Sequence, residues 1–286
     1  VYTPYSKKWL TKLDEDGVPD YPSQDHLKAI AHLQGPTVPA LKAMGFEATN
    51  EAFPDEKPDV DIIKQYKDER NFPDRPSTTR IGVHLRFGAI SVRDMIRRGQ
   101  EHSETWLKQL IWREFFMMIL DHFPKVVTES FRPEYDQIQW ENDSDKFDAW
   151  CAGKTGYPMV DAGMRELVET GFMHNRVRMV TASFLSKHLL IDWRKGEAFF
   201  AKHLIDYELS SNNGSWQWAA GTGCDAAPYF RVFNPTIQLE KFDPDKKYVR
   251  QWIPEFDDPF QYPKPIVEHA ASRDRAIERY AKAVKK

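Results

Sequence analysis

The stretch that decides the fold is residues 104–123, with the sequence ETWLKQLIWREFFMMILDHF. This spacing of apolar side chains, three and four residues apart, places them on one face of an α-helix. Pro124 follows directly and cannot continue a helix. We therefore predict a long helix here, with one face in a core. Its apolar positions are Leu107, Leu110, Ile111, Phe115, Met118 and Ile119.

Similar spacing predicts helices before and after this segment. Ser91 is a candidate N-cap, and Gly171 suits a helix end. Alternating strand patterns are nearly absent, and nothing resembles a β-α-β unit. The sequence therefore predicts an all-α fold. Helices are expected over residues 59–68, 78–85, 92–98, 157–170, 172–190, 197–209 and 212–220.

The first 60 residues differ from the rest because proline interrupts them repeatedly, from Pro4 to Pro58, and helical spacing is poor. We expect an arm or interdomain linker over residues 1–58 and a helical domain over residues 59–286. The chain opens abruptly, as if another segment preceded it.

The chain has 286 residues and a formal net charge of −3 at pH 7. This charge argues against a strongly basic nucleic-acid-binding protein but leaves room for a local basic face. Cys151 and Cys224 have a spacing that predicts neither a disulfide framework nor a metal site. No apolar run reaches membrane-spanning length, and no signal peptide is evident. We expect a soluble, cytoplasmic protein.

Arg113 and Glu114 stand in the middle of the apolar helix predicted over residues 104–123. Burying either charge without a partner is costly. The two residues therefore require either an internal salt bridge or a polar cavity beside the helix.

A second polar cluster lies in residues 173–179, MHNRVRM. On a helix, Asn175, Arg178 and Met179 share one face. An amide, a guanidinium and a flexible thioether together suit a ligand with a polar edge and an irregular apolar surface. Taken alone, such a cluster is more often structural.

Residues 206–218, DYELSSNNGSWQW, form a third unusual run. On a helix, Asn212 and Trp216 lie one turn apart, whereas Trp218 points nearly the opposite way. Gly214 inside a helix requires a reason, and the close approach of a ligand is one. Residues 75–82, RPSTTRIG, add hydroxyl groups at a predicted helix start, which is a weak signal for a phosphate site.

Taken in order, five runs resemble the photolyase/cryptochrome family, and most closely its bacterial class I cyclobutane pyrimidine dimer photolyases. The runs are WREF at 112–115, GKTGYPMVDA at 153–162, HNRVRM at 174–179, NNGSWQW at 212–218 and DAAPYFRVFNP at 225–235. The resemblance is strongest over residues 66–243. It implies the helical FAD-binding domain of that family, without the α/β antenna domain and its chromophore.

The resemblance implies that the chain binds FAD, which is reduced and anionic in the active state. Arg178 and Asp206 match an ion pair beside the flavin ring. Asn212 matches the residue beside flavin N5, where its oxygen can accept a hydrogen bond and favour reduced flavin. The implied FAD-binding residues are Tyr66, Thr78, Thr79, Ile81, Gly82, Trp112, Arg113, Asn175, Arg178, Asp206, Glu208 and Asn212.

Three tryptophans, Trp216, Trp193 and Trp140, match a chain of indoles that carries electrons from the surface to the flavin. Taken singly, Trp193 and Trp140 fit core packing. The complete set of motifs favours the electron chain.

The resemblance also implies a pocket for a pyrimidine dimer that is flipped out of DNA. Trp112 and Trp218 match the aromatic residues that pack against its bases, and Arg176, Arg231 and Lys241 are candidates for a basic rim. The implied catalytic residues are Asn212, Gln109, Trp112 and Met179. The implied DNA-binding residues are Gln109, Trp112, Asn175, Arg176, Met179, Trp218, Arg231 and Lys241.

Gln109 departs from the family pattern, because many cyclobutane dimer photolyases have Glu there. In having Gln at position 109, the chain resembles (6-4) photolyases and animal cryptochromes. Those proteins, however, carry a second His near position 179, where this chain has Met179. Glu208 in place of Asp and Phe172 in place of Trp are milder departures.

The resemblance therefore implies a deoxyribodipyrimidine photo-lyase that acts on DNA, and we expect it to be a monomer. Light-excited reduced FAD would pass an electron to the flipped dimer. The cyclobutane ring would then open, and the electron would return to the flavin. A cryptochrome-like photoreceptor and a (6-4) photolyase are the alternatives.

Overall fold

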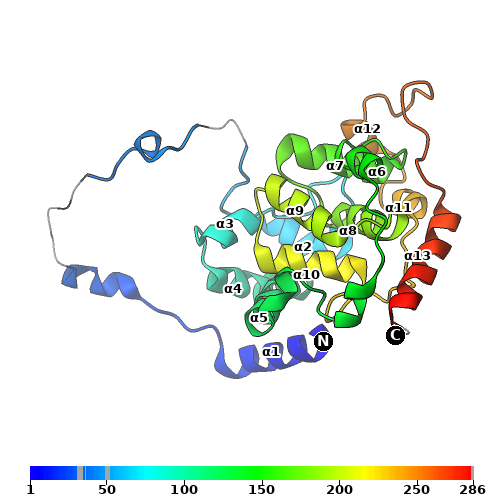
Figure 1. Cartoon of the computed structure of the whole chain (residues 1–286). Coiled ribbons are helices and arrows are strands. Elements are labelled where there is room, and N and C mark those ends of the chain that lie inside the picture. Colours follow the sequence, from blue (N-terminus) through cyan, green and yellow to red (C-terminus); the bar gives the residue numbers. More distant parts are fainter. Residues whose placement is uncertain (31–34, 36, 49–51, 285–286) are drawn as a thin grey trace.

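The computed structural model describes residues 1–30, 35, 37–48 and 52–284, in which every regular element is helical (Figure 1). This confirms the all-α prediction. The α-helices are α1 (Tyr2–Asp16), α2 (Val60–Glu69), α3 (Gly82–Phe87), α4 (Val92–His102), α5 (Glu104–His122), α6 (Ser144–Cys151), α7 (Pro158–Thr170), α8 (Asn175–Ser183), α9 (Trp193–His203), α10 (Leu209–Ala220), α11 (Pro235–Phe242), α12 (Lys247–Trp252) and α13 (His269–Val284).

Shorter helical segments connect these helices. Four are 3₁₀ segments, η1 (Ser23–Ala29), η2 (Leu41–Met44), η3 (Pro124–Val127) and η4 (Pro133–Gln137). The fifth, η5 (Phe184–His188), is a π-helix that continues α8 directly.

The apolar segment at 104–123 forms α5, one residue shorter than predicted. The Ser103 side chain accepts a hydrogen bond from Trp106 N, which caps the first turn. Ser91 caps α4 in the same way, as the sequence predicts. Local signals were sufficient at both starts because a cap uses only residues within one turn.

The segment expected to be an arm or linker contains a helix that was not predicted. The 15-residue helix α1 packs against α5, with Leu13 buried between them. Pro4 is tolerated because it lies in the first turn, where its missing N–H is not needed. The expected arm and the expected domain both include residues outside the described part, namely 31–34, 36, 49–51 and 285–286. The division at residue 58 stays a prediction.

Several other boundaries differ from the prediction. The helix expected over 78–85 begins only at Gly82, and that over 172–190 begins at Asn175. The helix expected over 197–209 runs instead from Trp193 to His203, because Asp192 provides the N-cap. Helices α6, α11, α12 and α13 were not predicted.

Helix α10 lies at the centre of the molecule, where it packs against α5, α8 and α9 (Figure 1). Two glycines permit this close packing. A methyl group at Gly214 of α10 would lie 2.2 Å from Phe116 of α5, and one at Gly196 of α9 would lie 2.2 Å from the Trp216 ring. The reason for Gly214 is therefore a neighbouring aromatic side chain within the protein, where the sequence had suggested a ligand.

The largest apolar cluster surrounds this junction and includes the fully buried Trp150, Trp193 and Trp216. None of the described helices is both long and apolar enough to cross a bilayer.

Candidate active-site cavity

A cavity of about 590 Å³ opens between α5, α8 and α10 and the segment that precedes α10. Its volume lies in the range usual for small-molecule and cofactor sites. The lining residues are Tyr2, Arg70, Thr105, Lys108, Gln109, Trp112, Arg113, Phe116, Asn175, Arg178, Met179, Ala182, Phe200, Leu204, Asp206, Tyr207, Glu208, Ser211, Asn212, Ser215, Trp216 and Trp218.

Most of the residues predicted to surround the flavin and the substrate meet at this cavity. They come from α5, α8, α10 and the segment that precedes α10, which the tertiary fold brings together. The predicted residues that line it are Gln109, Trp112, Arg113, Asn175, Arg178, Met179, Asp206, Glu208, Asn212, Trp216 and Trp218.

Arg178 and Asp206 form the charged part of the wall. The Arg178 Nη2 donates to both carboxylate oxygens of Asp206, at 3.2 and 2.9 Å, and its Nε donates to Met173 O at 2.6 Å. The two side chains are 26% and 18% exposed. Each charge therefore has a partner while both remain accessible from the cavity.

Asn212 is held from behind by Glu197 of α9. Its Nδ2 donates to Glu197 O at 3.1 Å and to Glu197 Oε1 at 2.8 Å. Burial raises the pKa of Glu197, although the bond from Asn212 opposes this shift. Because both amide hydrogens are used on one side, the Asn212 oxygen is the group available to a ligand.

Glu208 has a structural task within the site. Its carboxylate caps α10 by accepting hydrogen bonds from the N–H and hydroxyl groups of Ser210 and Ser211. Burial raises the pKa of Glu208, but these bonds outweigh that effect and leave the pKa lowered. Its oxygens are therefore largely engaged by the protein itself.

Arg113 and Glu114 do not bridge one another. Arg113 lines the cavity and donates to Leu85 O at 3.3 Å, whereas Glu114 is exposed and accepts from Trp9 Nε1 at 2.9 Å. Of the two explanations that the sequence offered, the polar cavity holds for Arg113. The expected burial of Glu114 was wrong.

Trp112 and Trp218, the predicted base-packing residues, both line the cavity. The Tyr2 ring of α1 stacks on Trp112, with centroids 3.6 Å apart and an interplanar angle of 4°. One face of Trp112 is thus covered by Tyr2. Sequence reasoning missed Tyr2 because it assigned residues 1–58 to an arm.

Five of the predicted FAD-binding residues, Tyr66, Thr78, Thr79, Ile81 and Gly82, do not line the cavity. Tyr66 and Ile81 are buried in the cluster between α2 and α5, and Thr79 accepts a hydrogen bond from Trp106 Nε1 at 3.3 Å. Gly82 lies next to Asp206 of the wall, since a methyl group added at Gly82 would lie 3.4 Å from Asp206 Cβ. Thr78 lies in the same loop, before α3. Their FAD contacts stay a prediction.

The three basic residues predicted for the rim differ in exposure. Arg231 and Lys241 are exposed. Arg176 is half-buried, donates to Asn71 Oδ1 at 2.7 Å and lies over the Phe242 ring at 4.2 Å. Burial lowers the pKa of Arg176. Arg70, which lines the cavity and which the sequence reasoning missed, is a further cation at the site.

The three predicted electron-transfer tryptophans lie in or against one apolar cluster. Trp216 lines the cavity and packs on Gly196, which is one turn from Trp193 on α9. Trp140 is half-buried and meets Tyr280 edge-on, with centroids 6.0 Å apart. Trp216 therefore borders the cavity, Trp193 is buried and Trp140 is half-buried, and the path between them stays a prediction.

A family model described as the FAD binding domain of DNA photolyase matches residues 106–260, which carry most of the cavity wall.

The chain belongs to the DNA photolyase family.

Its curated relatives in that family include deoxyribodipyrimidine photo-lyases. The Escherichia coli K12 enzyme is 38% identical over 322 residues, covering all of this chain and 68% of the relative. The Neurospora crassa enzyme is 40% identical over 78% of this chain and 43% of the relative. This chain thus spans 43% and 68% of the lengths of these two photolyases.

A solved photolyase structure has the same fold. The bacterial class III photolyase from Agrobacterium tumefaciens superposes with a TM-score of 0.74 and 41% identity, over 79% of this chain and 54% of that one.

Proposed function

We propose that this protein is a light-driven lyase that splits cyclobutane pyrimidine dimers in DNA, with FAD as its cofactor. One observation carries the proposal. A single cavity joins Asn212, Arg178 and Asp206, which suit a flavin, to Trp112 and Trp218, which suit unstacked bases.

The cavity wall fits the chemistry of a flavin. Phe200, Leu204 and Trp216 offer apolar surface for a flat ring system. The Arg178–Asp206 pair offers a donor and an acceptor to the polar edge of that ring, and Asn212 offers a carbonyl oxygen. When bound, FAD supplies the light absorption and the electron, whereas the residues named here bind and orient it.

The substrate side of the cavity is built from α5, α8 and α10. Trp112 and Trp218 offer flat apolar walls to a dimer that has left the duplex. Met179 adapts to an irregular surface, and Asn175 and Gln109 offer hydrogen bonds. Arg231 and Lys241 are exposed and would hold phosphates of the flanking DNA.

Trp216, Trp193 and Trp140 would return the flavin to its reduced form by carrying electrons from the surface. The half-buried Trp140 provides the solvent end of this path and Trp216 its cavity end. We further propose that the protein acts as a monomer in the cytoplasm, bound to damaged DNA.

The direct test is a repair assay. The protein, with its flavin chemically reduced, is mixed with an oligonucleotide that holds one thymine dimer and is illuminated in the near ultraviolet. Recovery of thymine absorbance in light, with none in darkness, is expected. Trp112→Ala should lose most of this activity.

If bound FAD is photoreduced but the dimer stays intact, cyclobutane dimer repair is refuted. Repair of a (6-4) photoproduct in a parallel reaction would then assign that specificity. Photoreduction with neither repair would leave the photoreceptor as the function.

A further inference from the structure

The guanidinium group of Arg194 lies beside the ring of Trp193. This indole is 1% exposed, and the guanidinium carbon of Arg194 lies 4.8 Å from the ring centroid. A cation near a neutral indole is attracted to the electron-rich face of the ring. If the indole loses an electron, the same cation repels the positive charge that remains.

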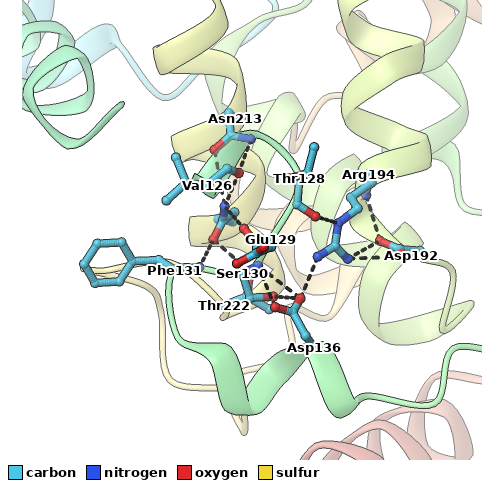
Figure 2. A network of polar contacts seen from close by, with 11 residues as sticks. Val126, Thr128, Glu129, Ser130, Phe131, Asp136, Asp192, Arg194, Asn213 and Thr222 are labelled. Atoms are coloured by element: carbon cyan, nitrogen blue, oxygen red, sulfur yellow. Dashed lines mark hydrogen bonds and ion pairs between the residues drawn. The ribbon is translucent and has the colours of Figure 1, made fainter. Parts of the chain in front are cut away.

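Two carboxylates fix and balance this cation (Figure 2). Arg194 Nη2 lies 2.6 Å from Asp136 Oδ1, and Arg194 Nη1 lies 3.3 Å from Asp192 Oδ1. Arg194 Nε also donates to Thr128 O at 2.6 Å. The three charged side chains are 21% to 30% exposed, so solvent screens their field only in part.

Further hydrogen bonds connect Asp136, the partner of Arg194, to helix α10 (Figure 2). Asp136 accepts hydrogen bonds from the N–H and the hydroxyl of Ser130. The next residue, Phe131, donates its N–H to Gln217 Oε1 at 2.9 Å. Gln217 follows Trp216 directly on α10, and its Nε2 donates to Val126 O at 3.0 Å. The loop at 126–131 therefore holds Arg194 in a fixed place relative to both Trp193 and Trp216.

We propose that Arg194, held by Asp136, sets how readily Trp193 gives up an electron, and so tunes electron flow along the tryptophan path. The proposal rests on the proposed function, because it assumes that path. In the step concerned, one electron leaves Trp193 for oxidised Trp216. Trp193 is oxidised, Trp216 is reduced, and no proton moves. Trp140 then gives an electron to oxidised Trp193, and a thiol reductant in solution reduces Trp140.

The charges predict opposite effects for two variants. Arg194→Gln removes the cation and leaves two carboxylates near the ring, so Trp193 becomes easier to oxidise. Asp136→Asn keeps the cation but removes one of the two negative charges that balance it, so Trp193 becomes harder to oxidise. We expect each variant to shift the equilibrium between the two indoles by about tenfold, or about 1.4 kcal/mol.

The experiment follows photoreduction of oxidised, FAD-loaded protein by a thiol, together with the tryptophan radical signal in transient absorption. Arg194→Gln should hasten electron transfer from Trp193, and Asp136→Asn should slow it. Arg194→Lys keeps the charge and should stay close to the parent protein. Thermal melting of each variant reports any loss of structure.

Opposite shifts for the two variants support the proposal. Shifts in the same direction, or none, overturn it, because a purely structural role would slow both. Unchanged photoreduction of the flavin in a Trp193→Phe variant would also overturn the proposal, because electrons would then reach the flavin without passing through Trp193. Dimer repair by chemically reduced protein does not use this path. A failure of the proposed function would thus appear in the repair assay and not here.

Discussion

Asn212 directs both of its amide hydrogen bonds at Glu197, one to the backbone oxygen at 3.1 Å and one to the carboxylate at 2.8 Å. This relationship decides which atom of Asn212 faces the cavity. Because Nδ2 is held by Glu197, the oxygen is left for the ligand. Glu197 is therefore a positioning residue that does not itself line the cavity.

Glu197→Ala should make the midpoint potential of the bound flavin more negative. The amide of Asn212 would keep only the backbone bond and could turn its donor towards the flavin, which loses about 1 kcal/mol of stabilisation of the reduced form. Glu197→Gln keeps an acceptor and should shift the potential less. Redox titration measures both, with Glu169→Ala on the exposed face of α7 as the control. Equal potentials in Glu197→Ala and the parent protein would refute this role.

Asp206→Ala should weaken FAD retention at least tenfold, because it removes the partner of Arg178 at the cavity wall. The matched control is Glu255→Ala, which breaks the Arg165–Glu255 pair of similar exposure, outside the cavity. The ratio of flavin to protein absorbance after dialysis measures retention. Equal flavin loss from both variants would mean that the effect is one of general stability.

Gly214→Ala should destabilise the fold by about 1–3 kcal/mol, because the added methyl group would overlap the Phe116 ring. Gly35→Ala, which meets no atom within 4 Å, is the neutral control. Denaturant unfolding measures both. The double variant Gly214→Ala with Phe116→Ala should cost less than the sum of its single changes, since the clash is then gone. Strict additivity would rule the clash out.

Acid should destabilise the protein partly through His188. Burial, followed by the charges of His269, Arg275 and Lys187, lowers the pKa of His188 from 6.5 to about 3. Between those pH values the unfolded state binds a proton that the native state does not. The stability contributed by neutral His188 is therefore complete above pH 6.5 and is lost as pH falls towards 3.

His188→Gln should reduce the slope of unfolding free energy against pH in that window by up to about 1.4 kcal/mol per pH unit. Denaturant unfolding at a series of pH values gives the slope. The exposed His26→Gln should behave like the parent protein. A slope unchanged in His188→Gln would show that other groups, such as His174, whose pKa burial also lowers to about 3, carry the whole effect.

Gln109→Glu should raise the yield of dimer repair per absorbed photon. Gln109 lines the cavity, and its amide cannot supply the acidic proton that a carboxyl group can offer to a negatively charged dimer. The yield is measured with the thymine-dimer oligonucleotide under calibrated light. Gln109→Ala is the reference for simple loss of contacts. A lower yield in Gln109→Glu than in the parent protein would show that this cavity is adapted to the neutral amide.

Sequence alone was sufficient for the features that depend on neighbours along the chain. The apolar spacing that defines α5 and the Ser103 and Ser91 caps lie within a few residues, so local rules describe them. The cavity residues were located through motif resemblance, and their types already suited a flavin and unstacked bases.

The tertiary structure decided what depends on contacts between distant segments. Helix α1 was missed because its stability comes from packing of Tyr2 and Leu13 against α5, which no local pattern reveals. The bond between Asn212 and Glu197, the cover of Tyr2 on Trp112 and the ion pair of Arg194 with Asp136 all join different elements. The sequence by itself determined which side chains are present and which helices can form. Only the packing of those helices decided which polar atoms are already paired and which remain free for a ligand, because pairing depends on distance in space.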